Sequence, residues 1–588
     1  MSHLRFGLLG MSLAVAIQCG GSRNTPGGES DGGADSTARG SGSGSGGSSG
    51  ATSSSGSSGG RSGGSSGGGS GGSSGSGSGG GTTGSSGSGS SSSSGGSGSG
   101  SGGTPPADAS VYTMHAHVNR DGFYVDGAFT EAALGSGTIH LDPTFNAAVM
   151  GNIYASPLYV QNGVGGKGTF YVVTASNNVY AIDETTATSS IPSKNVGPVP
   201  TVGTGTTPPG GIVGTPAIDP TTRLMVFDAE TAPSTHTIHA WSIDTFKEAW
   251  SYDVSMASVP MAGGGPLAFD PAPQSQRSAV LIVGGIAYVT YGGYWGDAGN
   301  YHGWVVGVPL SGPAGVKLYA TPTVQCGMWA AGGPASDGTN IFVSTGNGVK
   351  GSTWGGEFAV MRFQAGPVFS GQPTDYWYNV NDNGDQDLSG ANPMVVTMTG
   401  VPPFLVQLGK DGNAYLLSTT NLQGGASPMA QATIMGGSGE MSNVPAWATI
   451  PSGMTRPGGT YVATISNDGS PGSACPNGTS GDLVVFKVDP TAANPIDVVW
   501  CADNGGGGSP SITTSDGSND AIVWTFGTNT KGNNPGGDNQ LHAWDLASGK
   551  RLLTSSDMVA NTRHFTTPIF VHGRAMIVGD GGLYAFKP

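Results

Sequence analysis

The chain has 588 residues, of which 108 are glycine and only 10% are charged, and its formal net charge at pH 7 is −15. An acidic chain without any run of lysine or arginine lacks the basic surface that nucleic acid and anionic lipid headgroups require. We therefore expect no nucleic-acid partner, and the charge is typical of a soluble, exposed protein.

The first nineteen residues predict export. Arg5 precedes the apolar run 6–17, which is too short to span a bilayer and is typical of a signal sequence. The run ends in Ala-Ile-Gln-Cys19, which resembles a bacterial lipobox except that Gln18 stands where a small residue is usual. We expect residues 1–19 to be a signal whose Cys19 is lipidated. An ordinary secretory signal, giving a secreted or periplasmic protein, is the alternative.

A long low-complexity tract follows. Residues 41–103 are glycine and serine at all but five positions. Such a tract cannot bury apolar surface, so we predict that residues 20–108 form a disordered tether. Random-coil scaling gives it an end-to-end distance of about 50 Å.

Residues 109–136 form an N-terminal extension to the repeats. The segment Val111–His117 alternates enough to predict a strand lying against the repeat domain. His115 and His117 would then point to one side, as a metal-binding pair does. No Cys, His or acidic cluster stands beside them in the sequence, so a structural role is favoured.

Residues 137–588 are organised by a repeat of one or two small residues, a proline and an apolar run. The intervals between neighbouring prolines range from 50 residues (Pro216 to Pro266) to 68 residues (Pro266 to Pro334). One supersecondary unit repeated eight times explains this spacing. The prolines are Pro157, Pro216, Pro266, Pro334, Pro393, Pro445, Pro510 and Pro568.

Each proline is followed by further short, β-branched runs bounded by Gly, Asn and Asp, which are typical of strands. The second run of the third unit is Val280–Val283, and fourth runs with aromatic residues include Lys247–Val254 and Asp375–Val380. Four antiparallel strands per unit, repeated radially, predict an all-β, eight-bladed β-propeller. The eighth unit reaches only its third strand at Pro588, so we predict that a strand within 137–150 closes the last blade.

Export gives meaning to the cysteines. Cys475 and Cys501 lie in one repeat, and a disulfide between them is plausible in an oxidising compartment. Cys326 would then be a lone, packed thiol.

Two further features are candidate sites. The loop 381–387 carries oxygen-bearing side chains at every second position, as calcium loops do, but it lacks the glycine turn and distal glutamate of an EF-hand. A solvated connection in which Asp387 anchors the next strand is favoured. Five aromatic residues near the third and fourth repeats are either a stacking surface for a sugar or peptide or, for most of them, wedges between blades: Trp295, Tyr301, Trp304, Trp329 and Trp354.

The sequence resembles a known family over essentially all of residues 111–588. The segments VYTMHAHVNRDGFYVDG (111–127), IYASPLYVQNG (153–163) and TTPIFVHGRAMIVGDGGLYAFKP (566–588) are similar to bacterial secreted quinoprotein-like propellers with pyrroloquinoline-quinone (PQQ)-type repeats. AWDLASGK (543–550) is closest to the short repeat signature, with Leu553 where the family has a tryptophan. The resemblance implies the propeller fold and leaves function open.

Enzymes of that family hold a calcium ion on the quinone, with an aspartate base, a tryptophan under the ring and often a disulfide of adjacent cysteines. This chain has no adjacent cysteine pair, and no positions match the calcium ligands or the base. We therefore assign no catalytic, cofactor-binding or metal-binding residue, and we expect a protein that is not an enzyme. The alternative is a PQQ- and calcium-dependent dehydrogenase of alcohols or sugars.

The sequence thus predicts a lipid-anchored propeller at the outer membrane or cell surface, acting as a monomeric binding or scaffold protein. Its expected partners are a protein or polysaccharide ligand, and the membrane through the lipid anchor.

Overall fold

The structure, a computed structural model, describes residues 108–135, 139–201, 210–261, 264–294, 297–349, 353–380, 386–436, 443–453, 456–467, 470–528 and 536–588. The predicted signal sequence, Cys19 and the predicted tether up to residue 107 lie outside the described residues. None of the helices described is long and apolar enough to cross a membrane.

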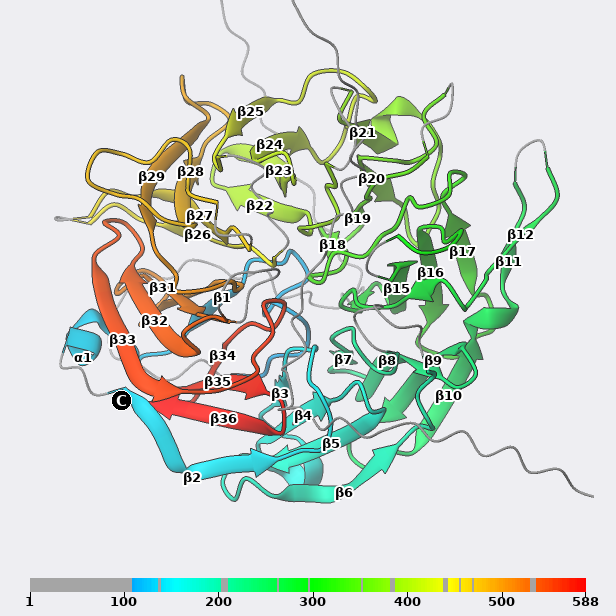
Figure 1. Cartoon of the computed structure of the whole chain (residues 1–588), viewed down its shortest axis with the longest axis horizontal. Helices are drawn as coiled ribbons and strands as arrows, with labels where there is room; N and C mark the ends of the chain where they lie inside the picture. The colour runs from blue at the N-terminus through cyan, green and yellow to red at the C-terminus, as the bar shows by residue number, and fades with distance from the viewer. Residues whose placement is uncertain are drawn as a thin grey trace, which may run out of the picture. The chain divides into compact units, whose positions relative to one another are not determined.

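Eight antiparallel sheets follow one another around a ring (Figure 1). Blade 1 contains β3 (Leu158–Val160), β4 (Thr169–Val173), β5 (Asn178–Asp183) and β6 (Ser189–Asn195). Blade 2 contains β7 (Ala217–Asp219), β8 (Leu224–Thr231), β9 (Thr235–Ser242) and β10 (Glu248–Asp253). Blade 3 contains β14 (Leu281–Val283), β15 (Ile286–Gly293), β16 (Trp304–Pro309) and β17 (Lys317–Ala320), with β13 (Gln274–Ser275) paired to the end of β15.

Blade 4 contains β18 (Ala335–Ser336), β19 (Ile341–Ser344), β20 (Ala359–Phe363) and β21 (Tyr376–Tyr378). Blade 5 contains β22 (Met394–Met398), β23 (Val401–Leu408), β24 (Asn413–Ser418) and β25 (Ala430–Thr433). Blade 6 contains β26 (Ala446–Ile450), β27 (Gly459–Ile465), β28 (Leu483–Val488) and β29 (Ile496–Ala502).

Blade 7 contains β30 (Ser511–Thr514), β31 (Ile522–Phe526), β32 (Gln540–Asp545) and β33 (Arg551–Met558). Blade 8 contains β34 (Ile569–Val571), β35 (Arg574–Gly579), β36 (Gly582–Lys587) and β2 (His140–Ala148). The helix α1 (Glu131–Gly135), the strand β1 (Phe123–Val125) and the hairpin β11 (Ser258–Val259) and β12 (Leu267–Ala268) stand outside these eight sets of four. Three 3-10 turns cover Val164–Gly166, Val254–Met256 and Pro373–Asp375.

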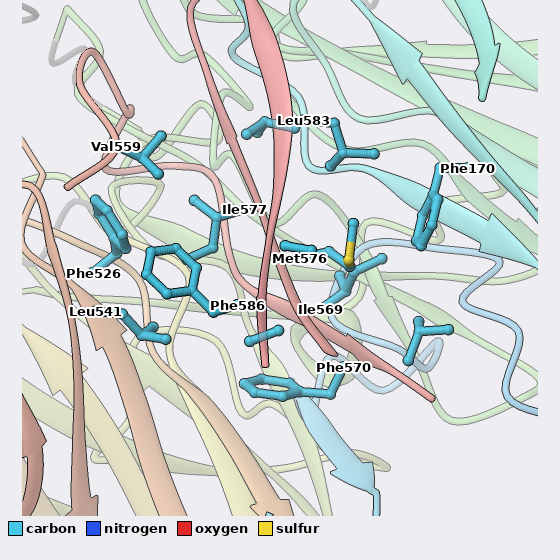
Figure 2. Packing of buried hydrophobic residues seen from close by; sticks show 14 of the residues in the cluster. Phe170, Phe526, Leu541, Val559, Ile569, Phe570, Met576, Ile577, Leu583 and Phe586 are labelled. Carbon is cyan, nitrogen blue, oxygen red and sulfur yellow. The ribbon is translucent and has the colours of Figure 1, made fainter. Parts of the chain in front are cut away.

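The last blade is closed by the N-terminal strand, as predicted. Strand β2 pairs antiparallel with β36, from His140 opposite Lys587 to Ala148 opposite Gly582. Figure 2 shows the core beside this closure, where side chains of blade 8 pack against blade 7 and Phe170 of blade 1. The eight-bladed, all-β fold is confirmed, and the closure leaves blade 8 with the same four strands as the others.

Burial explains why the strands read as continuous apolar runs. Middle strands have a blade on each side, so all five residues of β4 and of β31 are buried. Outer strands have one edge toward solvent, and β6 is mostly exposed. Strands of a propeller that neighbouring blades cover on both faces therefore read as unbroken apolar runs, instead of the alternation of apolar and polar residues that a half-exposed strand shows.

The assignment of the third repeat was wrong. Pro266 precedes β12 of the outlying hairpin, and Val280–Val283 overlaps the first strand of blade 3 instead of forming the second. The second strand is β15. The inserted hairpin contains its own Gly-Gly-Pro sequence, which resembles the start of a repeat, so the prediction places Val280–Val283 one strand too late.

The N-terminal extension follows the inner strands of the ring. Residues 108–126, here called the inner belt, bond in chain order to blade after blade. Five inner-strand N–H groups donate to belt carbonyl oxygens over 2.8–3.1 Å, from Ile218 to Tyr112, Ser336 to Val118, Val395 to Asn119, Trp447 to Asp121 and Ile512 to Gly122. In each case the donor is the second residue after a repeat proline.

Both ends of the inner belt form regular pairing. Val111 makes an isolated antiparallel bridge to Tyr159 of blade 1, and β1 runs parallel to β30 of blade 7. Between them the predicted strand Val111–His117 is wrong, because its residues after Val111 form bends and turns, with positive φ at His115 and Ala116. The segment bends because it must curve around the ring axis, which a straight strand cannot do.

Candidate functional site

The middle of the ring is filled by the protein's own side chains. Met114 of the inner belt forms an apolar cluster with Ala279, Ala331, Val444 and Phe565, each at most 6% exposed. Four of the five residues come from the segments that lead into inner strands of different blades. Propellers commonly bind ligands at the ring axis. Here the cluster around Met114 forms a hydrophobic plug at that axis.

Arg120 ties the inner belt to blades 3 and 4. Its side chain is fully buried, and its Nε donates to the Pro334 carbonyl oxygen over 2.9 Å. Its Nη1 donates to Thr113 Oγ1 (2.7 Å) and to the Met114 carbonyl (2.9 Å), and Nη2 donates to the Val280 carbonyl (3.2 Å). Burial lowers the pKa of Arg120 to about 9, so the group stays charged at neutral pH. Carbonyl dipoles, rather than a carboxylate, stabilise this cation.

His115 and His117 do not point to one side, as a strand over Val111–His117 would require. His115 is 1% exposed, whereas the side chain of His117 is 58% exposed and bonds Asp121 through Nδ1 at 2.9 Å. Burial, with the charge of Arg120, lowers the pKa of His115 to about 3 and keeps its imidazole neutral. Within the described residues, no three His, Cys, Asp or Glu side chains converge as a metal site would require.

A polar cluster lies between blades 2 and 3. Nδ1 of His236 contacts Asp228 Oδ2 at 2.8 Å, and Nε2 contacts the Gln274 carbonyl at 3.2 Å. Burial opposes the charged imidazole, but Asp228 and Glu230 outweigh it and raise the pKa of His236. Both ring nitrogens contact acceptors, so the imidazole joins the two blades through hydrogen bonds.

Trp329 stands before β18 and is packed on several sides. The Arg277 guanidinium lies 4.3 Å from the centre of its ring, and Arg277 Nε donates to the Trp329 carbonyl over 3.0 Å. A Cβ at Gly327 would meet the indole at 2.5 Å, and one at Gly292 would meet it at 2.7 Å. Glycine at both places lets the backbone approach the indole this closely.

Asp387 joins the loop after β19 of blade 4 to the β23–β24 turn of blade 5, and its anchoring of the strand start stays a prediction. It is 4% exposed, its Oδ1 accepts from the Asn347 N–H (2.5 Å), and Lys410 Nζ lies 3.9 Å from its Oδ2. The rest of the candidate calcium loop, 381–385, lies outside the described residues. Asp297 is also engaged, by the Tyr301 hydroxyl and by Asn347 Nδ2 (3.4 Å).

The residues around Trp329 do not present the open site that a quinone and its calcium ion need. Such a site needs a group of oxygen donors around the metal and an open indole face, but the carboxylates of Asp297 and Asp387 are bonded to neighbouring residues and Arg277 covers Trp329. The disulfide that the structure contains joins Cys475 to Cys501, with Cα atoms 5.7 Å apart, and not two adjacent cysteines. Cys326 is buried, which raises its thiol pKa.

The candidate aromatic residues other than Trp329 differ in burial. Tyr301 and Trp304 are 1% exposed and pack inside the protein, as wedges would. Trp295 lies outside the described residues. Trp354 is half-buried and stacks on Tyr376 and Tyr378, which sequence reasoning missed as site residues. The alternation Tyr-Trp-Tyr in 376–378 was the available signal, since it puts both tyrosines on one face of a strand.

Eight four-stranded blades closed by an N-terminal strand define an eight-bladed β-propeller. The fold matches quinohemoprotein alcohol dehydrogenase from Comamonas testosteroni, with 14% identity and a TM-score of 0.51 over 81% of this chain and 80% of that chain. It also matches quinohemoprotein alcohol dehydrogenase ADHIIG from Pseudomonas putida HK5, with 11% identity and a TM-score of 0.53 over 81% of this chain and 80% of that chain.

A weaker match is BamB from Moraxella catarrhalis, with 13% identity and a TM-score of 0.40 over 77% of this chain and 96% of that chain. No protein-family model matches the sequence, and no curated protein sequence matches it significantly. At these identities the two dehydrogenase matches establish the fold alone.

Proposed function

We propose that this protein is a binding propeller of the bacterial cell surface, held as a monomer on a lipid anchor at Cys19 and ready to bind a protein or polysaccharide. The observation that carries the proposal is the filled ring axis. The inner belt and the plug around Met114 occupy it, and Arg277 covers the indole of Trp329. A propeller whose axis is filled in this way offers its rim and outer faces to a ligand.

The predicted tether supports display over enzymatic turnover. The tether predicted for residues 20–108 would have a reach of about 50 Å by random-coil scaling, which would let the propeller search the surface around its anchor. Tethering raises the effective concentration of a binding domain near immobile ligands without any new contact.

The test uses the full chain expressed in a Gram-negative host. We expect membrane fractionation to recover the protein with the outer membrane, and mass spectrometry to find a diacylglycerol modification on Cys19. Cys19→Ser should release the protein into soluble fractions. The released protein should bind isolated envelopes saturably. Absence of any envelope binding would overturn the proposal.

The alternative, a PQQ- and calcium-dependent dehydrogenase, is favoured only by the shared fold. Titration of the purified full chain with PQQ and CaCl₂, followed by tryptophan fluorescence and dye-linked activity with alcohols and sugars, separates the two functions. We expect neither saturable quenching nor turnover. Both together would replace the binding function with the enzymatic one.

A further inference from the structure

We propose that Trp354, Tyr376 and Tyr378 form a binding platform for a neutral, β-linked polysaccharide on the outer side of blade 4. This inference rests on the proposed binding function and names its ligand class. The three residues are here called the aromatic platform. All three are half-buried, and they pack against the core of blades 3 and 4.

The rings of the aromatic platform are nearly parallel. The ring centroids of Trp354 and Tyr376 are 4.0 Å apart with an interplanar angle of 15°, and those of Trp354 and Tyr378 are 5.4 Å apart at 19°. The two tyrosine centroids are only 6.2 Å apart, so the tyrosines lie side by side against the indole instead of on its two opposite faces. Among the described rings, the two tyrosines are the ones that stack on the indole.

The platform is held rigid by its surroundings. Trp354 Nε1 donates to the Glu357 carbonyl over 2.9 Å, which fixes the plane of the indole. The Tyr378 N–H donates to the Gly424 carbonyl of the next blade over 3.3 Å. A Cβ at Gly425 would meet the Tyr378 hydroxyl at 2.7 Å, so glycine is what lets this ring lie against the blade 5 loop. Little side-chain entropy is therefore lost when a ligand binds.

The chemistry of the platform selects a neutral sugar. Neither the Tyr376 nor the Tyr378 hydroxyl has a hydrogen-bond partner within the described part of the chain, so both can donate to and accept from a ligand. The carboxylates behind the platform are already engaged. Asp375 accepts from Arg362 Nε (2.8 Å), and Glu357 accepts from the Gly355 N–H (2.8 Å). An aromatic face beside free hydroxyls, without a free charge, matches the C–H face and hydroxyl edge of a β-linked pyranose.

The first experiment measures retention of the full chain on insoluble cellulose, curdlan and chitin, and tryptophan quenching by their soluble hexasaccharides. We expect saturable binding to at least one of them. Trp354→Ala should weaken that binding at least tenfold, and Trp354→Phe by less. Tyr252→Ala, which removes a half-buried aromatic residue from the outer strand of blade 2, is the matched control and should bind as wild type does.

A second measurement needs no variant. Limited oxidation of the wild-type chain with N-bromosuccinimide should modify the peptide that contains Trp354, and the bound hexasaccharide should protect it. Trp304 and Trp500, each 1% exposed, should stay unmodified and serve as internal controls. Equal modification of Trp354 with and without saturating sugar would overturn the proposal even if Trp354→Ala failed to fold.

The outcomes separate this inference from the function beneath it. Binding to isolated envelopes without glycan retention, or glycan binding that Trp354→Ala leaves unchanged, overturns the aromatic platform while the binding function stands. If wild type binds a purified envelope protein but no glycan, and Trp354→Ala no longer binds that protein, the aromatic platform is a protein-binding surface instead. Absence of envelope binding, together with no retention on any of the three glycans, overturns both.

Discussion

The Nε of Arg120 donates to the carbonyl oxygen of Pro334 over 2.9 Å, although 214 residues separate them in the chain. This bond fastens the inner belt to blade 4 just before its first strand. It explains how an irregular segment with positive φ at His115, Ala116 and Arg120 keeps a single path around the ring. The long-range hydrogen bonds from Arg120 to the Pro334 and Val280 carbonyls offset the free-energy cost of these backbone conformations.

We expect Arg120→Met to lower the free energy of unfolding by about 2–4 kcal/mol, because the Pro334, Met114 and Val280 carbonyls would lose their buried donor. Urea denaturation of the full chain measures the change. Lys550→Met is the control, since Lys550 is exposed and its replacement should cost less than about 1 kcal/mol. Equal losses in the two variants would show that the inner belt is not locked by Arg120.

Closure of the ring by β2 makes a second prediction. Phe145 is 2% exposed, and its ring lies 5.8 Å from that of Phe170 in blade 1. Phe145→Ala should cost about 3–5 kcal/mol in the free energy of unfolding. Asn146→Ala changes the exposed neighbour on the same strand and should be nearly neutral. If the Phe145 variant unfolds at the wild-type urea midpoint, β2 does not stabilise the closed ring.

Trp500 and Gly549 show how neighbouring blades dock. Trp500 Nε1 donates to the Leu546 carbonyl over 2.9 Å, and a Cβ at Gly549 (φ +70°) would meet the indole at 2.6 Å. Gly549→Ala should cost about 2–3 kcal/mol, from left-handed strain plus displacement of the indole.

Gly517→Ala is the matched control for this docking. Gly517 also has positive φ (+91°), but a Cβ there would meet nothing within 4 Å. This variant should carry the backbone strain alone, about 1 kcal/mol. Thermal unfolding followed by tryptophan fluorescence compares them, and equal melting temperatures would argue against docking through Gly549.

Asp482 gives stability a pH dependence of known sign. Burial raises the pKa of Asp482 from 3.8 to about 6, and its Oδ1 accepts from the Asn504 N–H over 2.8 Å. A carboxyl whose folded pKa is raised contributes stability below the unfolded pKa, and this contribution is lost as pH rises through the folded value. Wild type should therefore lose up to about 3 kcal/mol relative to Asp482→Asn between pH 4 and pH 7. A constant difference from pH 4 to pH 7 would contradict the raised pKa.

The pair Cys475 and Cys501 closes a loop of 26 residues. Constraint of the unfolded chain by a loop of this length is worth about 3 kcal/mol. A reductant should lower the urea midpoint of wild type and leave that of the double variant Cys475→Ser/Cys501→Ser unchanged. Mass spectrometry of the peptides under non-reducing conditions checks the pairing, and a free thiol at either cysteine would contradict it.

The sequence by itself determined the eight-bladed ring and its closing strand. Both follow from local patterns, because short apolar runs bounded by turn residues form strands wherever they occur, and an eighth unit with three runs needs a fourth. The same local reasoning failed at blade 3, where Pro266 begins an inserted hairpin that imitates the start of a repeat.

Tertiary structure alone decided the path of the inner belt and the composition of the aromatic platform. The belt bonds through backbone groups, which every residue carries and no side-chain pattern reveals. Nothing in the local sequence marks Arg120 as buried, because its burial depends on the blades that surround it in the closed ring. Trp354 precedes β20 and the two tyrosines lie on β21, so their stacking depends on the pairing of β21 with β20. Contacts between distant segments depend on where the whole ring places them, and local sequence does not encode that placement.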